Sequence, residues 1–166
     1  MPWTELNLKA MPEIQNTIKL IYHADDDQDD RLLFAEAVDE LGLPASVRQA
    51  ADGLSLLDLL MGNASQLPQI IFLDINMPRK NGFECLEQIR KGQGPLGAVK
   101  VVMLSTSGAP ENIARSFELG ADLYAVKPST FAGLKELLSE ILESDWKREP
   151  KSKSKNKVYS SLTWLL

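Results

Sequence analysis

The segment from residue 70 to residue 78, Ile-Ile-Phe-Leu-Asp-Ile-Asn-Met-Pro, constrains the fold more than any other part of the chain. Its first four residues are apolar without alternation, which is typical of a central strand of a parallel sheet covered on both faces. Asp74 follows directly, and Pro78 and Gly82 indicate a loop after it. Open α/β sheets keep their ligand sites at the carboxyl ends of the strands. We therefore expect Asp74 to face a cleft and predict that it is the reactive residue.

Other apolar segments alternate with segments of helical periodicity along the chain. The predicted strands are residues 18–24, 45–50, 70–73, 100–104 and 121–126. Five strands that alternate with five helices predict an α/β fold, in which a parallel sheet carries helices on both faces.

The spacing of apolar residues also predicts which faces of the helices are buried. In the first helix, the expected inward positions are 33, 34, 37, 38 and 41. In the second helix, which Asp52 caps, we expect Leu54, Leu57, Leu60 and Met61 to be buried.

A chain of 166 residues with 44% hydrophobic residues is long enough for one domain with its own core. The single cysteine, Cys85, excludes an internal disulfide and agrees with a reducing compartment. No apolar run approaches the ~20 residues of a membrane span, and the N-terminus lacks the features of a signal peptide. We expect a cytoplasmic protein that does not bind membranes.

The net charge of −5 is unevenly distributed. The segment from Asp145 onward carries +4, so residues 1–144 carry −9. An acidic body argues against nucleic acid as a partner and suits a cation. We expect residues 1–17 to be an N-terminal extension, 18–143 the folded domain and 144–166 a basic tail. Solvated disorder is the preferred interpretation of the tail, and a docking or dimer-forming segment is the alternative.

Polar residues follow four of the five predicted strands, and all of them fall on one edge of the sheet. They are Asp25 and Asp26, Asp74, Ser105, and Lys127. Three carboxylates brought together either have raised pKa values or share a cation. Magnesium fits, because it prefers oxygen ligands and phosphate. A carboxylate beside such an ion can attack phosphorus and become an acyl phosphate, while the amine and the hydroxyl hold phosphoryl oxygens.

These motifs, in this order and spacing, resemble those of the receiver domains of two-component response regulators. The resemblance covers residues 18–143 and rests on five motifs: the pair Asp25-Asp26, Asp74 within Leu-Asp-Ile-Asn-Met-Pro, Gly82, Ser105, and Lys127-Pro128. It is greatest with the stand-alone receivers of the chemotaxis-regulator type. It implies a flavodoxin-like (βα)5 three-layer sandwich with the strand order 2-1-3-4-5.

The resemblance also implies a role for each matching residue. Asp74 would accept a phosphoryl group from the phosphohistidine of a histidine kinase, in a reaction that needs Mg²⁺. Asp26 would bind the ion directly, Asp25 through water, and Asn76 through its backbone carbonyl. Ser105 and Lys127 would contact the phosphoryl group, and Tyr124 would be the aromatic residue that moves inward when the hydroxyl reorients.

The resemblance implies a signalling switch that catalyses only its own phosphorylation and dephosphorylation, and not an enzyme in the usual sense. The expected partners are a sensor histidine kinase or phosphotransfer protein and a downstream protein target, with a second copy of the chain as a further candidate.

Two other functions are compatible with the same residues. One is a scaffold whose binding does not depend on phosphorylation. The other is an aspartate-nucleophile phosphatase, with Asp25 and Asp27 as its acidic pair. Asp27, Asp29 and Asp30 are more simply explained as acids in the first turn of a helix, which the helix dipole favours. His23 is expected to be a packed or hydrogen-bonded strand residue.

Overall fold

In the computed structural model, which describes residues 19–62, 66–143 and 157–159, a parallel sheet forms the centre of the protein. The described strands follow the order β2-β1-β3-β4-β5-β6, and every neighbouring pair is parallel. They are β1 (Lys19–Ala24), β2 (Ala45–Ala50), β3 (Ile70–Leu73), β4 (Lys100–Ser105), β5 (Leu123–Val126) and β6 (Lys157–Tyr159). The predicted α/β sandwich and the order of its first five strands are confirmed.

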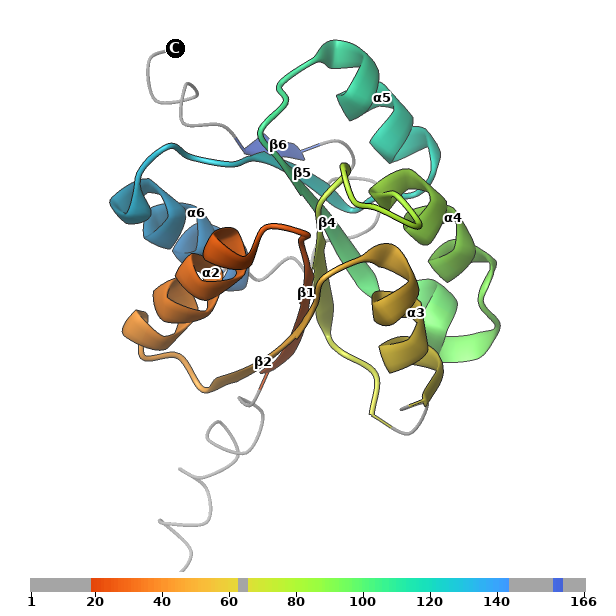
Figure 1. Cartoon of the computed structure of the whole chain (residues 1–166), viewed down its shortest axis with the longest axis horizontal. Coiled ribbons are helices and arrows are strands. Elements are labelled where there is room, and N and C mark those ends of the chain that lie inside the picture. Colours follow the sequence, from red (N-terminus) through yellow and green to blue (C-terminus); the bar gives the residue numbers. More distant parts are fainter. Residues whose placement is uncertain (1–18, 63–65, 144–156, 160–166) are drawn as a thin grey trace, which may run out of the picture.

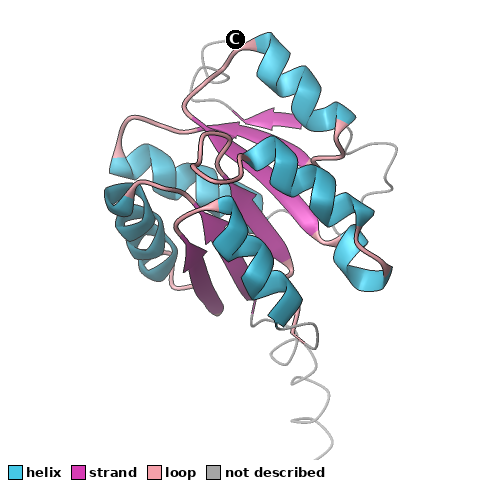
Figure 2. Ribbon diagram, turned by 45° about the vertical axis from the view of Figure 1, so that its right-hand side comes forward, coloured by secondary structure: helices cyan, strands magenta, loops and turns pink. Residues whose placement is uncertain are grey.

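Helices cover both faces of the sheet, as Figures 1 and 2 show. Helices α2 (Gln28–Glu40) and α6 (Phe131–Glu143) lie on one face. The other face carries α3 (Gly53–Gly62), α4 (Gly82–Lys91) and α5 (Pro110–Glu118), and a short 3-10 helix, η1 (Gly94–Ala98), precedes β4. Each face therefore has its own hydrophobic core, with the sheet between the two.

Strand β3 contributes to both cores. All four of its residues are at most 2% exposed. Ile71 and Leu73 pack in the core beneath α3 and α4, while Ile70 and Phe72 pack in the core beneath α2 and α6. The expectation of a strand covered on both faces is confirmed, and the edge of the sheet begins where this apolar run gives way to Asp74.

Local hydrogen bonds explain where the helices begin. The carboxylate of Asp27 accepts hydrogen bonds from the backbone N–H groups of Asp29 and Asp30 and so caps α2. Asn81 and Glu84 form a reciprocal capping box at the start of α4. These caps place both helix starts at the edge of the sheet where the predicted site lies.

The predicted buried face of α3 is partly wrong. Leu57 and Leu60 are buried as expected, but Leu54 is 39% and Met61 59% exposed, while Leu56 is fully buried. This helix has apolar residues around most of its circumference, so periodicity alone cannot decide which stripe meets the sheet. A similar error concerns α2. Leu33 is 41% exposed because it lies at the margin of the buried stripe formed by Phe34, Ala37 and Val38.

A sixth strand, which the sequence did not predict, corrects the expected count of five. Strand β6 lies in the predicted tail and pairs with β5, with Tyr124 opposite Val158. Tyr159 is 8% exposed in the core beneath α2 and α6, and Val158 packs on the opposite core. This strand has only three residues and lies in a stretch rich in Lys and Ser, so the alternation of apolar and polar residues that indicates a strand could not be recognised. The expected N-terminal extension and the rest of the tail lie outside the described residues.

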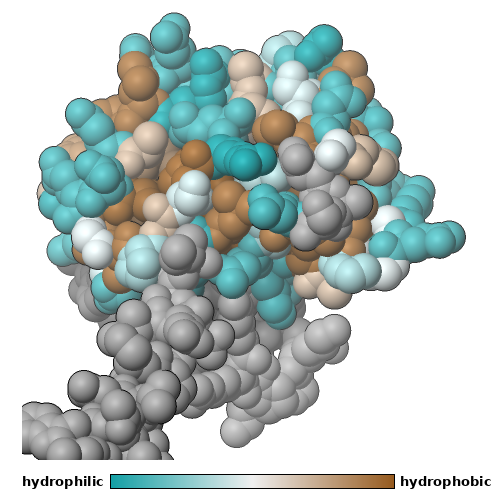
Figure 3. All heavy atoms as spheres, turned by 90° about the horizontal axis from the view of Figure 1, so that it is seen from below, coloured by the Kyte–Doolittle hydropathy of each residue, from teal (hydrophilic) through white to brown (hydrophobic). Residues whose placement is uncertain are grey.

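Figure 3 shows one end of the molecule, where hydrophilic side chains surround a central area of hydrophobic ones. Among the residues that the structure describes, no helix combines the length and the apolar character needed to cross a membrane.

Candidate functional site

Three carboxylates meet at the carboxyl ends of β1 and β3. Asp25 and Asp26 follow β1, and Asp74 follows β3. Each offers an oxygen, and these oxygens all lie within 4.8 Å of one another. Asp25 and Asp74 are buried, with 1% and 7% of their surface exposed, whereas Asp26 is exposed to solvent. The structure thus brings together the acidic residues that the sequence indicated and leaves one side of the cluster open.

The backbone around Asp74 is tightly fixed. Its N–H donates to the carbonyl of Ala24 at 3.0 Å, which extends the ladder between β3 and β1 by one residue. The following loop is closed by a hydrogen bond of 2.8 Å from the N–H of Gly82 to the carbonyl of Ile75. A Cβ at Gly82 would lie 2.2 Å from the carbonyl oxygen of Asp74, so no other residue fits there without movement.

Asp25 is held by its own loop. Its N–H donates to the carbonyl of Ala50 at 3.1 Å, and its Oδ1 accepts a hydrogen bond of 3.0 Å from the N–H of Asp27. The guanidinium of Arg31 donates to its backbone carbonyl at 2.8 Å. The side chain therefore has a fixed direction, with Oδ2 turned toward Lys127.

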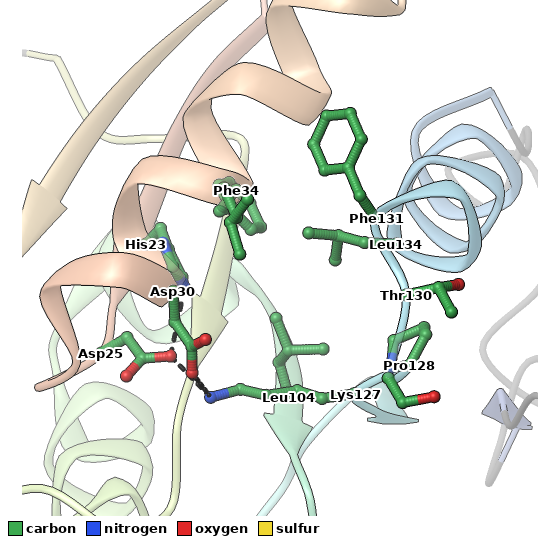
Figure 4. A pocket seen from close by; sticks show the side chains of 12 residues that line it. His23, Asp25, Asp30, Phe34, Leu104, Lys127, Pro128, Thr130, Phe131 and Leu134 are labelled. Atoms are coloured by element: carbon green, nitrogen blue, oxygen red, sulfur yellow. Dashed lines mark hydrogen bonds and ion pairs between the residues drawn. The ribbon is translucent and has the colours of Figure 1, made fainter.

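Lys127 follows β5 and connects the carboxylates, as Figure 4 shows for two of them. Its Nζ lies 2.6 Å from Oδ2 of Asp25, 3.2 Å from Oδ2 of Asp30 and 3.7 Å from Oδ2 of Asp74. Burial on its own would lower the pKa of this amine. The hydrogen bond to Asp25 and the negative charges of the three aspartates outweigh that effect and raise the pKa, so Lys127 is a firmly charged ammonium.

Burial raises the pKa of Asp74 from its ordinary value of 3.8 to about 6. The charges of Asp25 and Asp26 act in the same direction, while the ammonium of Lys127 opposes them. A nearby cation stabilises the charged form of a carboxylate whose pKa is raised. The site therefore has an excess of negative charge that a bound cation would neutralise.

Ser105 and Tyr124 lie beside this cluster and are both fully buried. The Oγ of Ser105 accepts a hydrogen bond of 3.1 Å from the N–H of Ser107, and its carbonyl accepts one of 2.7 Å from the N–H of Lys127. The hydroxyl of Tyr124 donates to the carbonyl of Ser107 at 2.6 Å. Burial, the largest influence, raises the pKa of Tyr124. The segment after β4 is thus tied to both Ser105 and Tyr124.

His23 is a buried, packed strand residue, as expected, and its contacts do not suggest that it accepts a phosphoryl group. Its ring stacks on Phe34, with 3.9 Å between the ring centroids, and its Nδ1 lies 3.0 Å from the amide nitrogen of Gln49. Burial lowers the pKa of His23 to about 3, and the charges of Lys127 and Arg31 act in the same direction. The ring is therefore neutral at neutral pH.

The cluster has the chemistry of a site for a hard divalent cation. Its donors are all carboxylate oxygens, one of them open to solvent, and Mg²⁺ takes such ligands while keeping several waters. Asn76, the other predicted ligand, lies in the loop between β3 and α4 with its side chain exposed. The residues present fit the ion, and their assignment as ligands remains a prediction.

One site residue was missed by sequence reasoning. Asp30 was interpreted as a helix-dipole acid, yet its carboxylate pairs with Lys127 at 3.2 Å. Its place in the first turn of a helix that starts at this edge of the sheet was the available signal. Asp27, by contrast, uses Oδ1 of its carboxylate to cap α2, which agrees with its interpretation as an acid at the start of a helix.

Comparison with known proteins gives a consistent result. A family model for the response regulator receiver domain matches residues 21–139. The chain is 31% identical over 136 residues to the probable methanogenesis regulatory protein FilR2 of Methanothrix harundinacea (strain 6Ac), which covers 79% of this chain and 87% of that protein.

Two solved structures are similar in both fold and sequence. The crystal structure of the Mn²⁺-bound form of response regulator Rcp1, a protein known from Synechocystis, has a TM-score of 0.69 and 28% identity and covers 76% of this chain and 96% of that one. The phosphorylated cyanobacterial phytochrome response regulator RcpA has a TM-score of 0.69 and 30% identity and covers 76% of this chain and 94% of that one.

Proposed function

The chain belongs to the response regulator receiver family, and from that premise we propose that it is a phosphorylation switch whose phosphoacceptor is Asp74. The phosphoryl group comes from the phosphohistidine of a histidine kinase or phosphotransfer protein, in a reaction that needs Mg²⁺. The phosphorylated domain then changes its binding to a protein target or passes the phosphoryl group onward. The proposal places the protein in the cytoplasm, where its single buried thiol, Cys85, stays reduced.

One observation carries this proposal. Asp74 is a buried carboxylate with a raised pKa that lies 3.7 Å from an ammonium and close to two further carboxylates. A structural ion pair would need only one acid for one base. Three acids around one lysine leave an excess of negative charge, which favours a group that arrives with a cation, as a phosphoryl group with Mg²⁺ does.

The chemical step is a transfer of the phosphoryl group from nitrogen to oxygen. An oxygen of Asp74 forms a bond to phosphorus while the bond from phosphorus to the imidazole nitrogen breaks, and the leaving imidazole keeps the electron pair and takes up a proton. The product is an acyl phosphate on Asp74. The position of Lys127 supports its role, because an ammonium 3.7 Å from the nucleophile can stabilise charge on an entering phosphoryl oxygen.

When bound, Mg²⁺ would neutralise negative charge on the phosphoryl oxygens. The carboxylates of Asp25, Asp26 and Asp74 would hold it, together with the backbone carbonyl of Asn76. Asp25 is already oriented for this by the N–H of Asp27. Mn²⁺ binding by Rcp1 is a property of that relative, and it supports a divalent cation here.

Switching follows from the hydrogen bonds that Ser105 and Lys127 make. In the proposed reaction, Lys127 exchanges its contact with Asp25 for one with the phosphoryl group, and the Ser105 hydroxyl donates to another phosphoryl oxygen. Ser105 then releases the N–H of Ser107. Because the carbonyl of Ser107 accepts from Tyr124, the segment between β4 and α5 and the ring of Tyr124 respond together.

The proposed kinase contact lies on α2, at the margin of the site. Leu32 and Leu33 are 59% and 41% exposed there, one turn or less from Asp30, which pairs with Lys127. Exposed leucines on the helix that carries Asp30 are suited to binding an apolar partner surface. In this proposal the domain catalyses its own phosphorylation and the hydrolysis of its own acyl phosphate, and it acts as a signalling switch.

Phosphorylation by acetyl phosphate tests this function without the cognate kinase. We expect the intact mass of the wild-type chain to increase by one phosphoryl group, only when Mg²⁺ is present, and we expect no increase for Asp74→Asn. Asp39→Asn, which changes an exposed acid on α2, is the matched control and should behave as wild type. Equal labelling of the wild type and Asp74→Asn would contradict the proposal. A folded wild type that takes up no phosphoryl group would favour the phosphorylation-independent scaffold.

A further inference from the structure

A pocket of about 150 Å³ opens between α2 and α6, with Lys127, Asp25 and Asp30 at one end of it (Figure 4). Residues from β1, α2, β4 and α6 line it together with the segment after β5. Asp25 and Lys127 of the proposed phosphorylation site lie at one end of the pocket, but Asp74 does not line it, and neither the metal ion nor the phosphoryl group of the proposed reaction accounts for the space between the two helices. The pocket therefore needs an explanation of its own.

The polar floor of the pocket includes a buried donor without a close acceptor. The amide nitrogen of Gln49 donates to the carbonyl of Arg31 at 2.7 Å and faces Nδ1 of His23 at 3.0 Å. Because an amide nitrogen only donates, Nδ1 is the acceptor and the ring proton is on Nε2. Nε2 lies 3.9 Å from Oδ2 of Asp25, beyond hydrogen-bond reach. His23, 1% exposed, lines the pocket, and among the described residues its Nε2–H has no acceptor within hydrogen-bond distance.

The charges at the floor favour a neutral ligand. Asp25 and Asp30 are both paired with the ammonium of Lys127. Two carboxylates and one ammonium leave an excess of negative charge, which disfavours an anion, and both carboxylates already have Lys127 as their cationic partner on this side. Asp30 is partly exposed and keeps free acceptor capacity. A hydroxyl group suits both neighbours, since it can accept from His23 and donate to Asp30.

The walls of the pocket are apolar and select the body of the ligand. Phe34 and Leu104 are buried, Pro128, Phe131 and Leu134 are partly buried, and Leu33 is exposed at the rim. The ring of Phe34 is already stacked on His23. A space of about 150 Å³ is large enough for one benzene-sized ring.

We propose that this pocket binds a small neutral aromatic alcohol, with the ring between α2 and α6 and the hydroxyl between His23 and Asp30. Phenol is the simplest molecule of this class. For a ligand of this size, the dissociation constant is expected to be on the order of 1 mM. Binding does not require phosphorylation. The pocket can therefore fail to bind phenol while Asp74 is still phosphorylated, and it can bind phenol even if Asp74 is not phosphorylated.

The test is a titration of the full-length, unphosphorylated protein with phenol, followed by amide chemical shifts. We expect saturable shifts for residues of α2 and α6 and none for residues of α5. Toluene, which has the same ring but no hydroxyl, is expected to bind roughly three- to tenfold more weakly because it makes no hydrogen bond. His23→Phe keeps a ring at this position and should reduce phenol binding by a similar factor.

Two neighbouring leucines on α2 provide a matched pair of variants. Leu33→Trp fills the pocket from its rim and should abolish the saturable shifts, while Leu32→Trp, on a more exposed residue that does not line the pocket, should leave them unchanged. Both positions are exposed enough for the fold to persist, which thermal unfolding verifies. The proposal is overturned if wild type shows no saturable shifts, if toluene binds as tightly as phenol, or if the two tryptophan variants behave alike.

Discussion

Asp74 is ionised at neutral pH, although burial and the neighbouring carboxylates disfavour its charged form. Because the fold raises its pKa from 3.8 to about 6, this carboxyl favours folding fully below pH 4, and its contribution is lost as the pH rises through 6. Asp74→Asn should therefore stabilise the metal-free protein at pH 7 by roughly 1 to 3 kcal/mol. The gain should disappear near pH 4, as measured by urea unfolding at both pH values. A gain that does not change with pH would contradict this account of Asp74.

Loss of Lys127 would leave the buried carboxylate of Asp25 without its ammonium partner. Asp25 is 1% exposed, and its Oδ2 lies 2.6 Å from this ammonium. Lys127→Met should destabilise the metal-free protein by about 3 kcal/mol or more, because a buried carboxylate loses its partner. Excess Mg²⁺ should restore part of that loss in urea unfolding, since the cation would join the same carboxylates.

A surface pair provides the control for Lys127. Lys91 pairs with Glu87 on α4, and both side chains are more than half exposed. Lys91→Met should change the free energy of unfolding by no more than about 0.5 kcal/mol, with or without Mg²⁺. If Mg²⁺ gave no recovery in Lys127→Met, the carboxylates would not be the site of the cation.

At the scale of elements, the loop between β3 and α4 determines the position of Asp74. A Cβ at Gly82 would come within 2.2 Å of the carbonyl oxygen of Asp74, and the backbone N–H groups of both residues are held by hydrogen bonds. Gly82→Ala should therefore cost about 3 kcal/mol or more in urea unfolding and should slow phosphorylation by acetyl phosphate. Gly62→Ala is the control, because no atom lies within 4 Å of its added Cβ. It should be neutral or slightly stabilising, and equal losses in the two variants would refute this role of Gly82.

The strands could be predicted from the sequence more reliably than the helix faces. The run from residue 70 to residue 73 is apolar throughout and has the length of a buried strand, so it leaves few alternatives. The helix α3 is also rich in leucine, but its apolar residues occupy several faces, and only contact with the sheet selects Leu56 over Leu54. Periodicity identifies an element, and packing then chooses the buried stripe.

At the scale of the whole molecule, β6 pairs the end of the described chain with β5 and forms one edge of the sheet. Tyr159 is 8% exposed, and its ring packs in the core beneath α2 and α6. Tyr159→Ser should reduce the free energy of unfolding by about 2 to 3 kcal/mol and speed amide exchange in β5. Leu32→Ser, on an exposed residue, should change stability by less than about 0.5 kcal/mol. Unchanged exchange in β5 would show that β6 does not protect that strand.

The topology explains why the site could be predicted before any distance was known. Parallel strands bring their carboxyl ends to one edge, so Asp25, Asp74 and Lys127 had to be neighbours once the strands were placed. The pairing of Asp30 with Lys127 could not be predicted in the same way, because it depends on how α2 lies on the sheet. The pocket between α2 and α6 depends on the same packing, and no pattern in the sequence predicts it.

The central claim is that Asp74 becomes an acyl phosphate. Reduction with borohydride converts an aspartyl phosphate into homoserine and leaves other aspartates unchanged, so peptide mass spectrometry can locate the modified residue. After treatment with acetyl phosphate and Mg²⁺, we predict homoserine at position 74 and aspartate at positions 25 and 26. Homoserine at position 25 or 26 with intact Asp74, or labelling that persists when Mg²⁺ is removed, would contradict the account.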